Sequence, residues 1–494
     1  MKIVLANLSG VQKLSDGRIR HFVKAGSRWP MTIGYAKHVD YYPFPFYLAY
    51  ATALLKKTFG PADVEGIDGV ANDYDEEELF KEIEKRRPEI FIAEVTLITL
   101  KDDLAFIKKV KDKLQCVVIV VGVYVSSFQE KVLESNPSID YAIYGEYELS
   151  LKELVDGIIT KRDLKQIPGI ILRDKGAIVK HPQRAAISDL NLLPFPDRKN
   201  FPISMYADFS MHFPCVSIMA SRGCPAGCVY CVERHVTYAS GKYRMRDYRS
   251  VVDEMEECKR SYGAKQFYFD DQSFVVNKEY VTKLCEEMKR RNLNVPWTCM
   301  GDAMFLDYET LKMMAAAGCI GMKFGVESAN AEILKGIHKP LNVEKSKEVA
   351  RWCRNLGIMT HATFCIGLPD ETEETIQETI DLIKNLDVDS AQVSKAVPYP
   401  GTPFYDWAKS KGYLVTNDLD LYDGMAKSVL SYPNLPAARI DFWYEKISKM
   451  VSRKKLLHYL KHPFSSISMI FYMFKKNGWK MSVQSMATFL KRSY

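Results

Sequence analysis

Short β-rich runs and helical patterns alternate along about the first 160 residues of the chain. The segment 116–121 is apolar at every position, as expected for a central strand that is covered on both faces. This alternation is typical of a doubly wound parallel sheet. The expected strands are residues 2–6, 63–68, 89–95, 116–123 and 141–144, and the expected helices are residues 46–59, 75–86, 102–113, 128–135 and 149–160.

A second alternating region begins after a proline-rich stretch. Residues 169–180 have the pattern of a hairpin, and residues 189–214, which four prolines interrupt, are expected to form a linker. Six β/α units follow from residue 215, which predicts an incomplete barrel whose chemistry lies at the C-terminal ends of its strands. The expected barrel strands are residues 216–220, 265–270, 296–300, 320–326, 358–366 and 388–394.

The pattern as a whole predicts an α/β protein in four parts. In a doubly wound sheet ligands bind beyond the C-terminal ends of the strands, which here are residues 122–127 and 145–148. The four parts are the doubly wound sheet domain (1–188), the linker (189–214), a partial (β/α)6 barrel (215–430) and a helical C-terminal region with a basic amphipathic tail (431–494).

The composition agrees with a folded chain that has several cores. With 494 residues, of which 47% are hydrophobic and 26% are charged, the chain is long enough for about two or three domains and too apolar for extended disorder. Its first residues resemble a strand more than a signal peptide, and its apolar runs are shorter than the roughly 20 residues that span a bilayer. We therefore expect a cytoplasmic protein without a transmembrane helix.

Three of the 11 cysteines have the spacing of metal ligands. Cys224, Cys228 and Cys231 form a C-x-x-x-C-x-x-C loop directly after the expected strand 216–220. One interpretation is a zinc site in which His235 supplies the fourth ligand. The other is a 4Fe-4S cluster in which one iron has no protein ligand and can bind a small molecule. The other cysteines show no close spacing, so we expect buried thiols there, with a second cluster assembled across the fold as the alternative.

The cysteine loop resembles the cluster-binding loop of the radical S-adenosylmethionine (SAM) enzymes. The resemblance covers roughly residues 215–411, because further segments of that family follow in order. It implies that a partial barrel holds a 4Fe-4S cluster and SAM. The matching segments are residues 267–274, 318–328, 367–372 and 398–403. The side chains and backbone implied to lie near SAM are Tyr230, Asp270, Asp271, Glu327 and Gly367.

Each of these SAM-site residues also has a plainer interpretation as a capped strand end, a solvated carboxylate, a packed loop or a turn. One segment departs from the family. After the third barrel strand the chain reads Cys299-Met300-Gly301-Asp302-Ala303, where many relatives have a basic residue, so no polar partner of SAM is assigned there. No catalytic residue is assigned beyond the three cluster cysteines.

The first domain resembles the cobalamin-binding domain that precedes the barrel in one large subfamily of these enzymes. Segments 122–127, 140–148 and 193–196 follow the order of that subfamily. The D-x-H-x-x-G motif of other cobalamin proteins is absent, as it commonly is in this subfamily. The alternative is a domain of this type that has lost its cofactor and only shapes the substrate site. The resemblance implies cobalamin contacts through Gly122, Tyr124, Ser126, Gly145 and Glu146.

The resemblance also implies a reaction. One electron, from a reductant such as flavodoxin or ferredoxin, would let the cluster cleave SAM to methionine and a 5′-deoxyadenosyl radical. The leading hypothesis is cobalamin-dependent methylation of an unactivated carbon of a small-molecule substrate. The alternative for an enzyme is radical cyclisation, oxidation or carbon–carbon coupling without methyl transfer. The alternative of another class is a non-catalytic iron–sulfur or zinc scaffold.

The net charge of +7 is concentrated at the C-terminal end. Residues 452–494 contain nine basic residues and no acidic one, which leaves 59 basic against 61 acidic residues in the rest of the chain. Interleaved apolar side chains predict an amphipathic helix, either packed on the barrel or lying on the inner face of an anionic membrane. The membrane interpretation favours an apolar or lipid-like substrate. No nucleic-acid partner is expected, because no supporting module occurs elsewhere.

Overall fold

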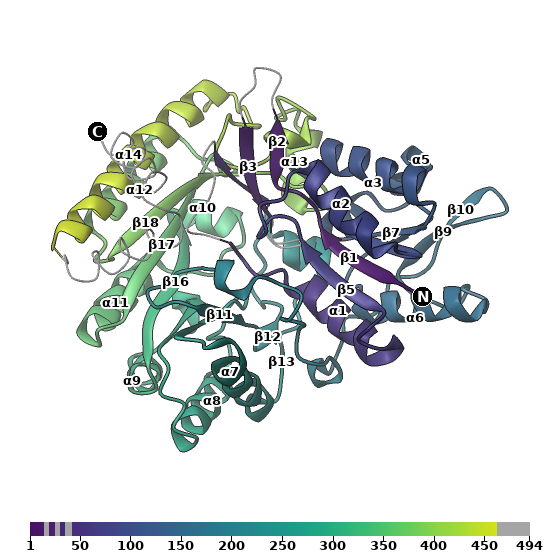
Figure 1. Cartoon of the computed structure of the whole chain (residues 1–494). Coiled ribbons are helices and arrows are strands. Elements are labelled where there is room, and N and C mark those ends of the chain that lie inside the picture. The colour runs from purple at the N-terminus through teal and green to yellow at the C-terminus, as the bar shows by residue number, and fades with distance from the viewer. Residues whose placement is uncertain (14–18, 25–29, 35–41, 462–494) are drawn as a thin grey trace.

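The computed structural model describes residues 1–13, 19–24, 30–34 and 42–461. Two α/β units lie side by side, with the N-terminal unit at the right of Figure 1. The first contains a 7-stranded sheet and the second a 6-stranded sheet. A continuous cluster of buried apolar side chains runs from one face of the first sheet through the linker into the barrel. The two units therefore share a core.

The N-terminal sheet is a doubly wound parallel sheet, as the sequence predicts. Its order is β10-β9-β8-β7-β6-β1-β5, so the chain passes from β1 to β5 on one side and then to β6 on the other. The parallel strands are β1 (Ile3–Asn7), β5 (Val64–Asp68), β6 (Ile90–Glu94), β7 (Val117–Val121) and β8 (Tyr141–Ile143), and an antiparallel hairpin of β9 (Ile170–Asp174) and β10 (Ala177–Lys180) extends the β8 edge. The main helices are α1 (Phe46–Phe59), α2 (Glu76–Arg86), α3 (Leu100–Leu114) and α6 (Glu148–Thr160).

Three parts of this unit differ from the sequence prediction. The strand expected at 116–123 ends at Val121, because Gly122 has a φ of 107° and turns the chain into a helix. The single helix expected at 128–135 is two short helices that meet at Gln129, whose φ is 49°. The short helices are α4 (Val123–Phe128) and α5 (Glu130–Ser135), and an unexpected antiparallel sheet consists of β2 (Val11–Lys13), β3 (Ile19–Lys24) and β4 (Pro30–Gly34).

Replacing Gly122 by alanine is expected to destabilise the chain more than replacing Gly60. The two glycines have left-handed φ values of 107° and 102°, a conformation that costs other residues about 1–3 kcal/mol. A Cβ at Gly122 would lie 2.8 Å from the carbonyl oxygen of Val95, whereas a Cβ at Gly60 would meet no atom within 4 Å. Urea unfolding should show the larger loss for Gly122→Ala, and equal losses would contradict the close approach.

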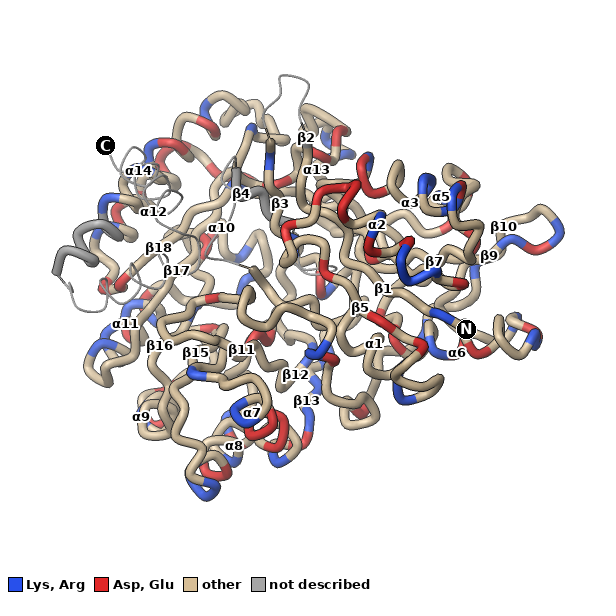
Figure 2. Tube along the Cα trace, in the orientation of Figure 1, with Lys and Arg blue, Asp and Glu red and all other residues tan. Residues whose placement is uncertain are grey.

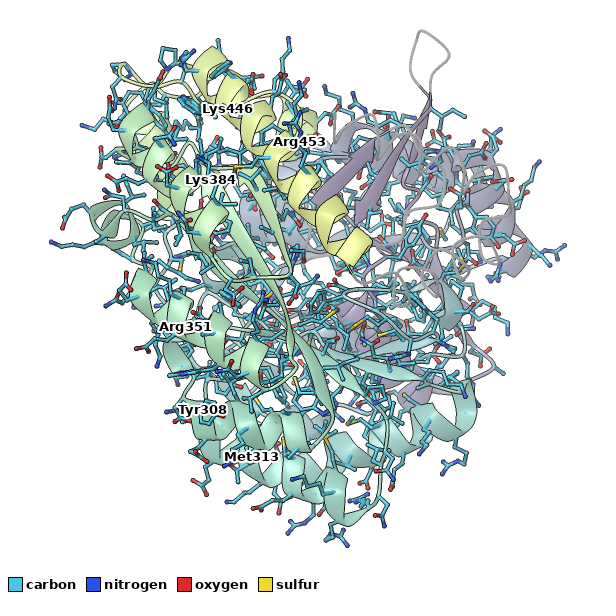
Figure 3. The ribbon with its side chains drawn as sticks, turned by 90° about the vertical axis from the view of Figure 1, so that its left-hand side faces the viewer. Tyr308, Met313, Arg351, Lys384, Lys446 and Arg453 are labelled. Atoms are coloured by element: carbon cyan, nitrogen blue, oxygen red, sulfur yellow. The ribbon has the colours of Figure 1, made fainter. Side chains whose placement is uncertain are left out.

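The second unit is an open, all-parallel barrel of six strands, as predicted. Its strand order, β11-β14-β15-β16-β17-β18, follows the sequence without closing. The strands are β11 (Cys215–Ile218), β14 (Gln266–Phe269), β15 (Trp297–Gly301), β16 (Cys319–Glu327), β17 (Met359–Ile366) and β18 (Ser390–Lys395). The helices are α7 (Tyr248–Tyr262), α8 (Lys278–Arg290), α9 (Tyr308–Ala316), α10 (Ala331–Gly336), α11 (Val343–Asn355), α12 (Glu373–Asn385) and α13 (Pro403–Ser410). Figure 3 shows α9, α11, α12 and α14 along the outside of the barrel.

The linker closes the N-terminal end of the barrel. The carbonyl oxygen of Phe209 accepts hydrogen bonds from Gln266 Nε2 at 3.0 Å and from Thr298 Oγ1 at 3.2 Å. The Phe209 ring packs so closely on Gly321 that a Cβ there would lie 2.7 Å from it. Because one end of the barrel is blocked, its chemistry is confined to the C-terminal ends of the strands.

A long helix, α14 (Ala437–Lys461), follows the barrel. It packs beside β18 and α12, where Asp441 lies 2.7 Å from Lys395 Nζ and Arg439 forms an ion pair with Glu373. Its first half carries Asp441 and Glu445 together with Arg439 and Lys446, and the charged residues that follow, Lys449 and Arg453, are basic (Figure 2). Of the basic tail predicted at 452–494, residues 452–461 form the end of this helix, and residues 462–494 lie outside the described residues. In the described part of the chain, no helix combines the length and apolar character needed to span a bilayer.

Candidate functional site

The cysteine loop lies beyond the C-terminal end of β11. The two-residue strands β12 (Ser221–Arg222) and β13 (Arg244–Met245) pair antiparallel at its base. Gly223 has a φ of 91° and lies against the backbone of Lys242, where a Cβ would collide with the carbonyl group. A π-helix, Glu233–Thr237, follows the third cysteine. The loop therefore begins and ends at the same pair of short strands.

The loop brings the three predicted cluster cysteines together. Burial raises the pKa of the Cys228 thiol to about 11 and that of Cys231 to about 12, and the nearby Cys224 adds to both increases. A bound metal cation would reverse this effect, because it favours the thiolate form. Three adjacent thiols, of which Cys228 is buried and Cys224 and Cys231 are partly buried, are thus a suitable donor set for an iron centre.

The candidate fourth ligand of the predicted zinc alternative has another contact within the loop. His235, the candidate fourth ligand, has its Nε2 at 3.1 Å from the carbonyl oxygen of Cys228. This contact makes His235 less available as the fourth ligand of a zinc ion.

Side chains that the sequence analysis did not single out hold the loop. Gln272, just after β14, accepts a hydrogen bond from the Gly223 amide at 2.8 Å through its Oε1. Arg234 Nη1 donates to the carbonyl oxygen of Cys224 at 3.2 Å. Gln272 lies inside segment 267–274, so the resemblance pointed to its neighbourhood, whereas no local signal identifies Arg234.

A buried polar group lies beside the cysteines. Glu327 ends β16 with a φ of 68° and hydrogen-bonds to Tyr230, and its Oε1 is 3.8 Å from Lys339 Nζ. Lys339 Nζ also lies 3.1 Å from Asp302 Oδ2. Burial raises the pKa of Glu327 although Lys339 opposes the increase. Asp302 comes from the segment in which the sequence offered no partner of SAM, and Lys339 was missed because nothing in its own segment distinguishes it.

The two predicted carboxylates after β14 are both buried, and that of Asp271 contacts the base of the cysteine loop. Asp271 accepts a hydrogen bond from the Ser221 hydroxyl and another from the Ala220 amide at 3.3 Å. These contacts tie the end of β14 to the base of the cysteine loop. Asp270 is next to it and 5% exposed, and its own amide donates to the carbonyl oxygen of Ile218 at 2.9 Å.

Gly367 lies in a fixed turn after β17. Its amide and that of Leu368 donate to Glu371 Oε2 at 2.5 and 3.3 Å, and its carbonyl oxygen accepts from the Tyr432 hydroxyl at 2.8 Å. Burial outweighs these two amide hydrogen bonds and raises the pKa of Glu371 to about 8. The turn thus presents Gly367 with a φ of 80° and no side chain at the strand end.

The structure brings together three of the five residues expected to contact cobalamin. Ser126 Oγ lies 3.2 Å from the carbonyl oxygen of Gly122 and accepts from the Gly145 amide at 3.0 Å. Tyr124 packs on Phe128, and its hydroxyl accepts from Asn136 at 3.3 Å. The Glu146 carboxylate is 3% exposed and binds two arginines of the barrel unit.

The other cysteines are free thiols. Cys299 is buried beside Cys319, and Cys285 and Cys353 lie near Cys319 as well. Burial raises the pKa of Cys285, Cys299 and Cys353. Of these eight cysteines all but Cys365 are buried, as expected for thiols that pack in the core.

Comparisons with known proteins agree with the site. Residues 218–383 match the Radical SAM superfamily. An uncharacterized methyltransferase of Pyrococcus horikoshii is 30% identical over 420 residues, which cover 84% of this chain and 88% of that protein. An anaerobic magnesium-protoporphyrin IX monomethyl ester cyclase of Rubrivivax gelatinosus is 28% identical over 366 residues, which cover 72% of this chain and 64% of that protein. The cobalamin-dependent SAM radical enzyme OxsB, solved with aqua-cobalamin and SAM bound, has a TM-score of 0.69 at 14% identity, covering 99% of this chain and 75% of that one. The chain therefore belongs to the radical SAM superfamily, as an enzyme whose fold is similar to that of OxsB.

Proposed function

We propose that the protein methylates an unactivated carbon of a small molecule with the help of a 4Fe-4S cluster, SAM and cobalamin. The observation that carries the proposal is the group of three cysteine thiols at the open end of the barrel, beside the Glu327–Lys339–Asp302 group. The Pyrococcus methyltransferase and the cobalamin-bound OxsB structure support the choice of reaction and cofactor.

The cluster and SAM, when bound, supply a 5′-deoxyadenosyl radical. The three cysteines would hold the cluster. Glu327 and Asp302 offer carboxylates and Lys339 offers an ammonium group, which match the amine and the carboxylate of the methionyl part of SAM. Tyr230, fixed by its hydrogen bond to Glu327, would limit the movement of the bound cofactor. The linker plug at the opposite end helps to exclude water from the barrel.

Cobalamin would lie between the C-terminal edge of the N-terminal sheet and the barrel. At this edge Ser127 Oγ is buried and has no hydrogen-bond partner among the described residues. Gly122, Gly145 and Gly401 form turns with positive φ here, and Gly401 faces Ser127 from the barrel side. Bare turns and an unsatisfied hydroxyl suit a large ligand that has both polar and apolar edges. Glu146 is expected to contribute indirectly, because its carboxylate is already bound.

The methylation proposal predicts two coproducts of SAM. Methyl transfer leaves S-adenosylhomocysteine, whereas radical formation leaves methionine and 5′-deoxyadenosine. Anaerobically reconstituted protein, given cobalamin, a reductant, methyl-deuterated SAM and a substrate extract, should release both coproducts in equal amounts together with a deuterium-labelled product. Mass spectrometry of the mixture measures all three.

The second candidate is cyclisation, oxidation or carbon coupling without methyl transfer, which the similarity to the cyclase favours. The same mixture separates the two reactions. The release of 5′-deoxyadenosine without S-adenosylhomocysteine or a labelled product would contradict methylation and support this alternative. A one-electron carrier of the flavodoxin or ferredoxin type is the proposed reductant for either reaction.

We also propose an apolar or lipid-like substrate that is reached from a membrane surface through the basic tail. The composition of residues 452–494 supports this proposal. The full chain should co-sediment with anionic vesicles, and a chain that ends at residue 461 should do so less, with the difference disappearing at high salt. Equal co-sedimentation of both chains would remove the membrane proposal and leave the reaction unaffected.

A further inference from the structure

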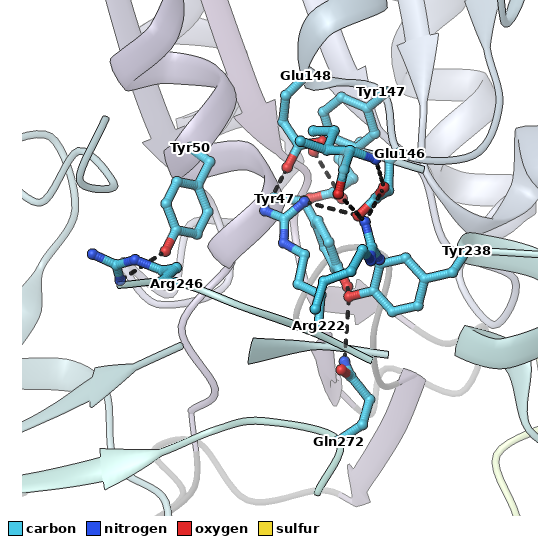
Figure 4. Close-up of polar contacts among 12 residues, drawn as sticks. Tyr47, Tyr50, Glu146, Tyr147, Glu148, Arg222, Tyr238, Arg246 and Gln272 are labelled. Carbon is cyan, nitrogen blue, oxygen red and sulfur yellow. Dashed lines mark hydrogen bonds and ion pairs between the residues drawn. The ribbon is translucent and has the colours of Figure 1, made fainter. Parts of the chain in front are cut away.

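Two arginines at the base of the cysteine loop reach into the N-terminal unit. Arg222 and Arg244 are paired residues of β12 and β13, the strands that enter and leave the loop. Arg222 Nη1 lies 3.2 Å from Glu146 Oε1, and Arg244 Nη1 lies 2.7 Å from Glu146 Oε2. One carboxylate thus binds both ends of the loop (Figure 4). Glu146 follows β8, more than 70 residues before the loop.

The contacts form a charge-balanced, buried network. Arg222 Nη2 also lies 2.7 Å from Glu148 Oε1, and the Arg222 and Glu148 side chains are 1% and 0% exposed. The Arg222 guanidinium lies over the rings of Tyr47 and Tyr50 on α1, 5.0 and 5.1 Å from their centroids. Two arginines therefore pair with two glutamates beside the rings of two tyrosines, and these charged groups have almost no access to water.

A neutral chain of hydrogen bonds connects the same two units. The hydroxyls of Tyr47, on α1, and Tyr238, in the loop, are bonded to each other. Gln272 Nε2 donates to Tyr238 at 3.3 Å, and Gln272 Oε1 accepts from Gly223, the residue before the first cysteine. Figure 4 shows this chain next to the ion pairs. The N-terminal unit therefore reaches the cysteine loop at its base and through Gln272.

Burying this network contributes little net free energy to holding the two units together. Buried ion pairs cost desolvation free energy that their attraction often does not recover, and apolar side chains of the same size stabilise as well or better. Planar guanidinium groups that share one carboxylate do, however, fix direction and register. A role in geometry therefore explains the network better than a role in stability.

We propose that Glu146, with Arg222 and Arg244, positions the iron–sulfur loop, so that the N-terminal unit sets the geometry in which the three cysteines hold their cluster. Gln272 acts in the same way on the first cysteine through the Gly223 amide. The Gly145 amide next to Glu146 binds Ser126 at the expected cobalamin edge, so one segment supports both cofactor sites. The inference rests on the cluster of the proposed function but not on methyl transfer.

The test measures iron release from the full-length, anaerobically reconstituted protein to a chelator, a readout that needs neither substrate nor turnover. Glu146→Gln keeps the shape of the side chain but removes its charge. Because residues that orient metal ligands typically change metal retention about 10- to 100-fold, release should accelerate by that order. Gln272→Met should accelerate release as well, with little change in the melting temperature.

Asp103→Asn is the matched control. Asp103 forms a buried ion pair with Lys24 at 2.8 Å inside the N-terminal unit, with side chains 3% and 0% exposed and without contact to the loop. The Asp103→Asn variant should have a lower melting temperature than the parent but should release iron at a rate within about twofold of the parent rate. Electron paramagnetic resonance of the reduced cluster with SAM should change for Glu146→Gln and Gln272→Met and stay unchanged for the control.

Two results would overturn the proposal. One is parental iron release and spectra for Gln272→Met and Glu146→Gln, and the other is release from Asp103→Asn that is as fast as from Glu146→Gln. If Glu146→Gln does not fold, iron release and the spectrum of Gln272→Met alone test the proposal. A parent protein that binds no iron would instead contradict the proposed function.

Discussion

Cys228→Ala protein is expected to hold no intact 4Fe-4S cluster and to release no 5′-deoxyadenosine from SAM. Only three thiolates are available on the loop, and the fourth iron must stay open for SAM, so no other side chain can replace the lost ligand. Removing a ligand in this arrangement eliminates the reaction instead of slowing it. Iron and sulfide analysis after anaerobic reconstitution, followed by chromatography of the SAM products, measures both effects.

Cys116→Ala is the matched control. Cys116 is also a buried thiol, 4% exposed, but it precedes β7 in the N-terminal unit and is distant in sequence from the loop. Its replacement should cost some stability through lost packing and leave the cluster content unchanged. Full iron content and 5′-deoxyadenosine release in Cys228→Ala would show that the loop does not hold the cluster.

Lys339→Met is expected to produce the largest loss of stability among single substitutions at the site. The change leaves the Glu327 and Asp302 carboxylates buried together without the cation that lies 3.8 and 3.1 Å from them. Removing one member of a buried charge group typically costs about 3–5 kcal/mol. SAM affinity should fall as well, because the remaining carboxylates repel its carboxylate. Urea unfolding and calorimetric titration with SAM measure the two effects.

Lys335→Met supplies the comparison on the neighbouring helix α10. Lys335 pairs with Glu332 at 3.7 Å, but the two side chains are 80% and 83% exposed. Exposed pairs of this kind contribute roughly 0–1 kcal/mol. If Lys339→Met proves as stable as Lys335→Met and binds SAM equally well, the buried polar group does not have the role proposed for it.

The sequence predicted the parts of the fold that depend on local pattern. The apolar run at β7 and the spacing of helices α1, α2 and α6 indicated a doubly wound sheet, because strands and helices have different repeats of apolar residues in the sequence. The small sheet of β2, β3 and β4 was missed, since its short strands carry many polar residues. The end of β7 was misplaced by two residues, because the turn depends on the conformation of one glycine.

In the candidate site too, residues with a local sequence pattern were predicted and residues placed by long-range contacts were not. The cysteines were found from their spacing within eight residues of sequence. Lys339, Gln272 and Arg222 act through contacts with residues 12 or more positions away, which no local pattern reports. Glu146 was expected to contact cobalamin because of its place after β8. The contact of its carboxylate with the base of the cysteine loop was not predicted.

The central claim is that the loop of Cys224, Cys228 and Cys231 makes this chain a radical SAM enzyme. The most direct measurement is the amount of 5′-deoxyadenosine that anaerobically reconstituted protein forms from SAM after addition of a strong one-electron reductant. The account predicts 5′-deoxyadenosine in the parent protein, none without reductant and none in Cys228→Ala. Intact SAM after reduction of a fully loaded cluster, with no 5′-deoxyadenosine formed, would contradict the account and identify the chain as a non-catalytic iron–sulfur scaffold.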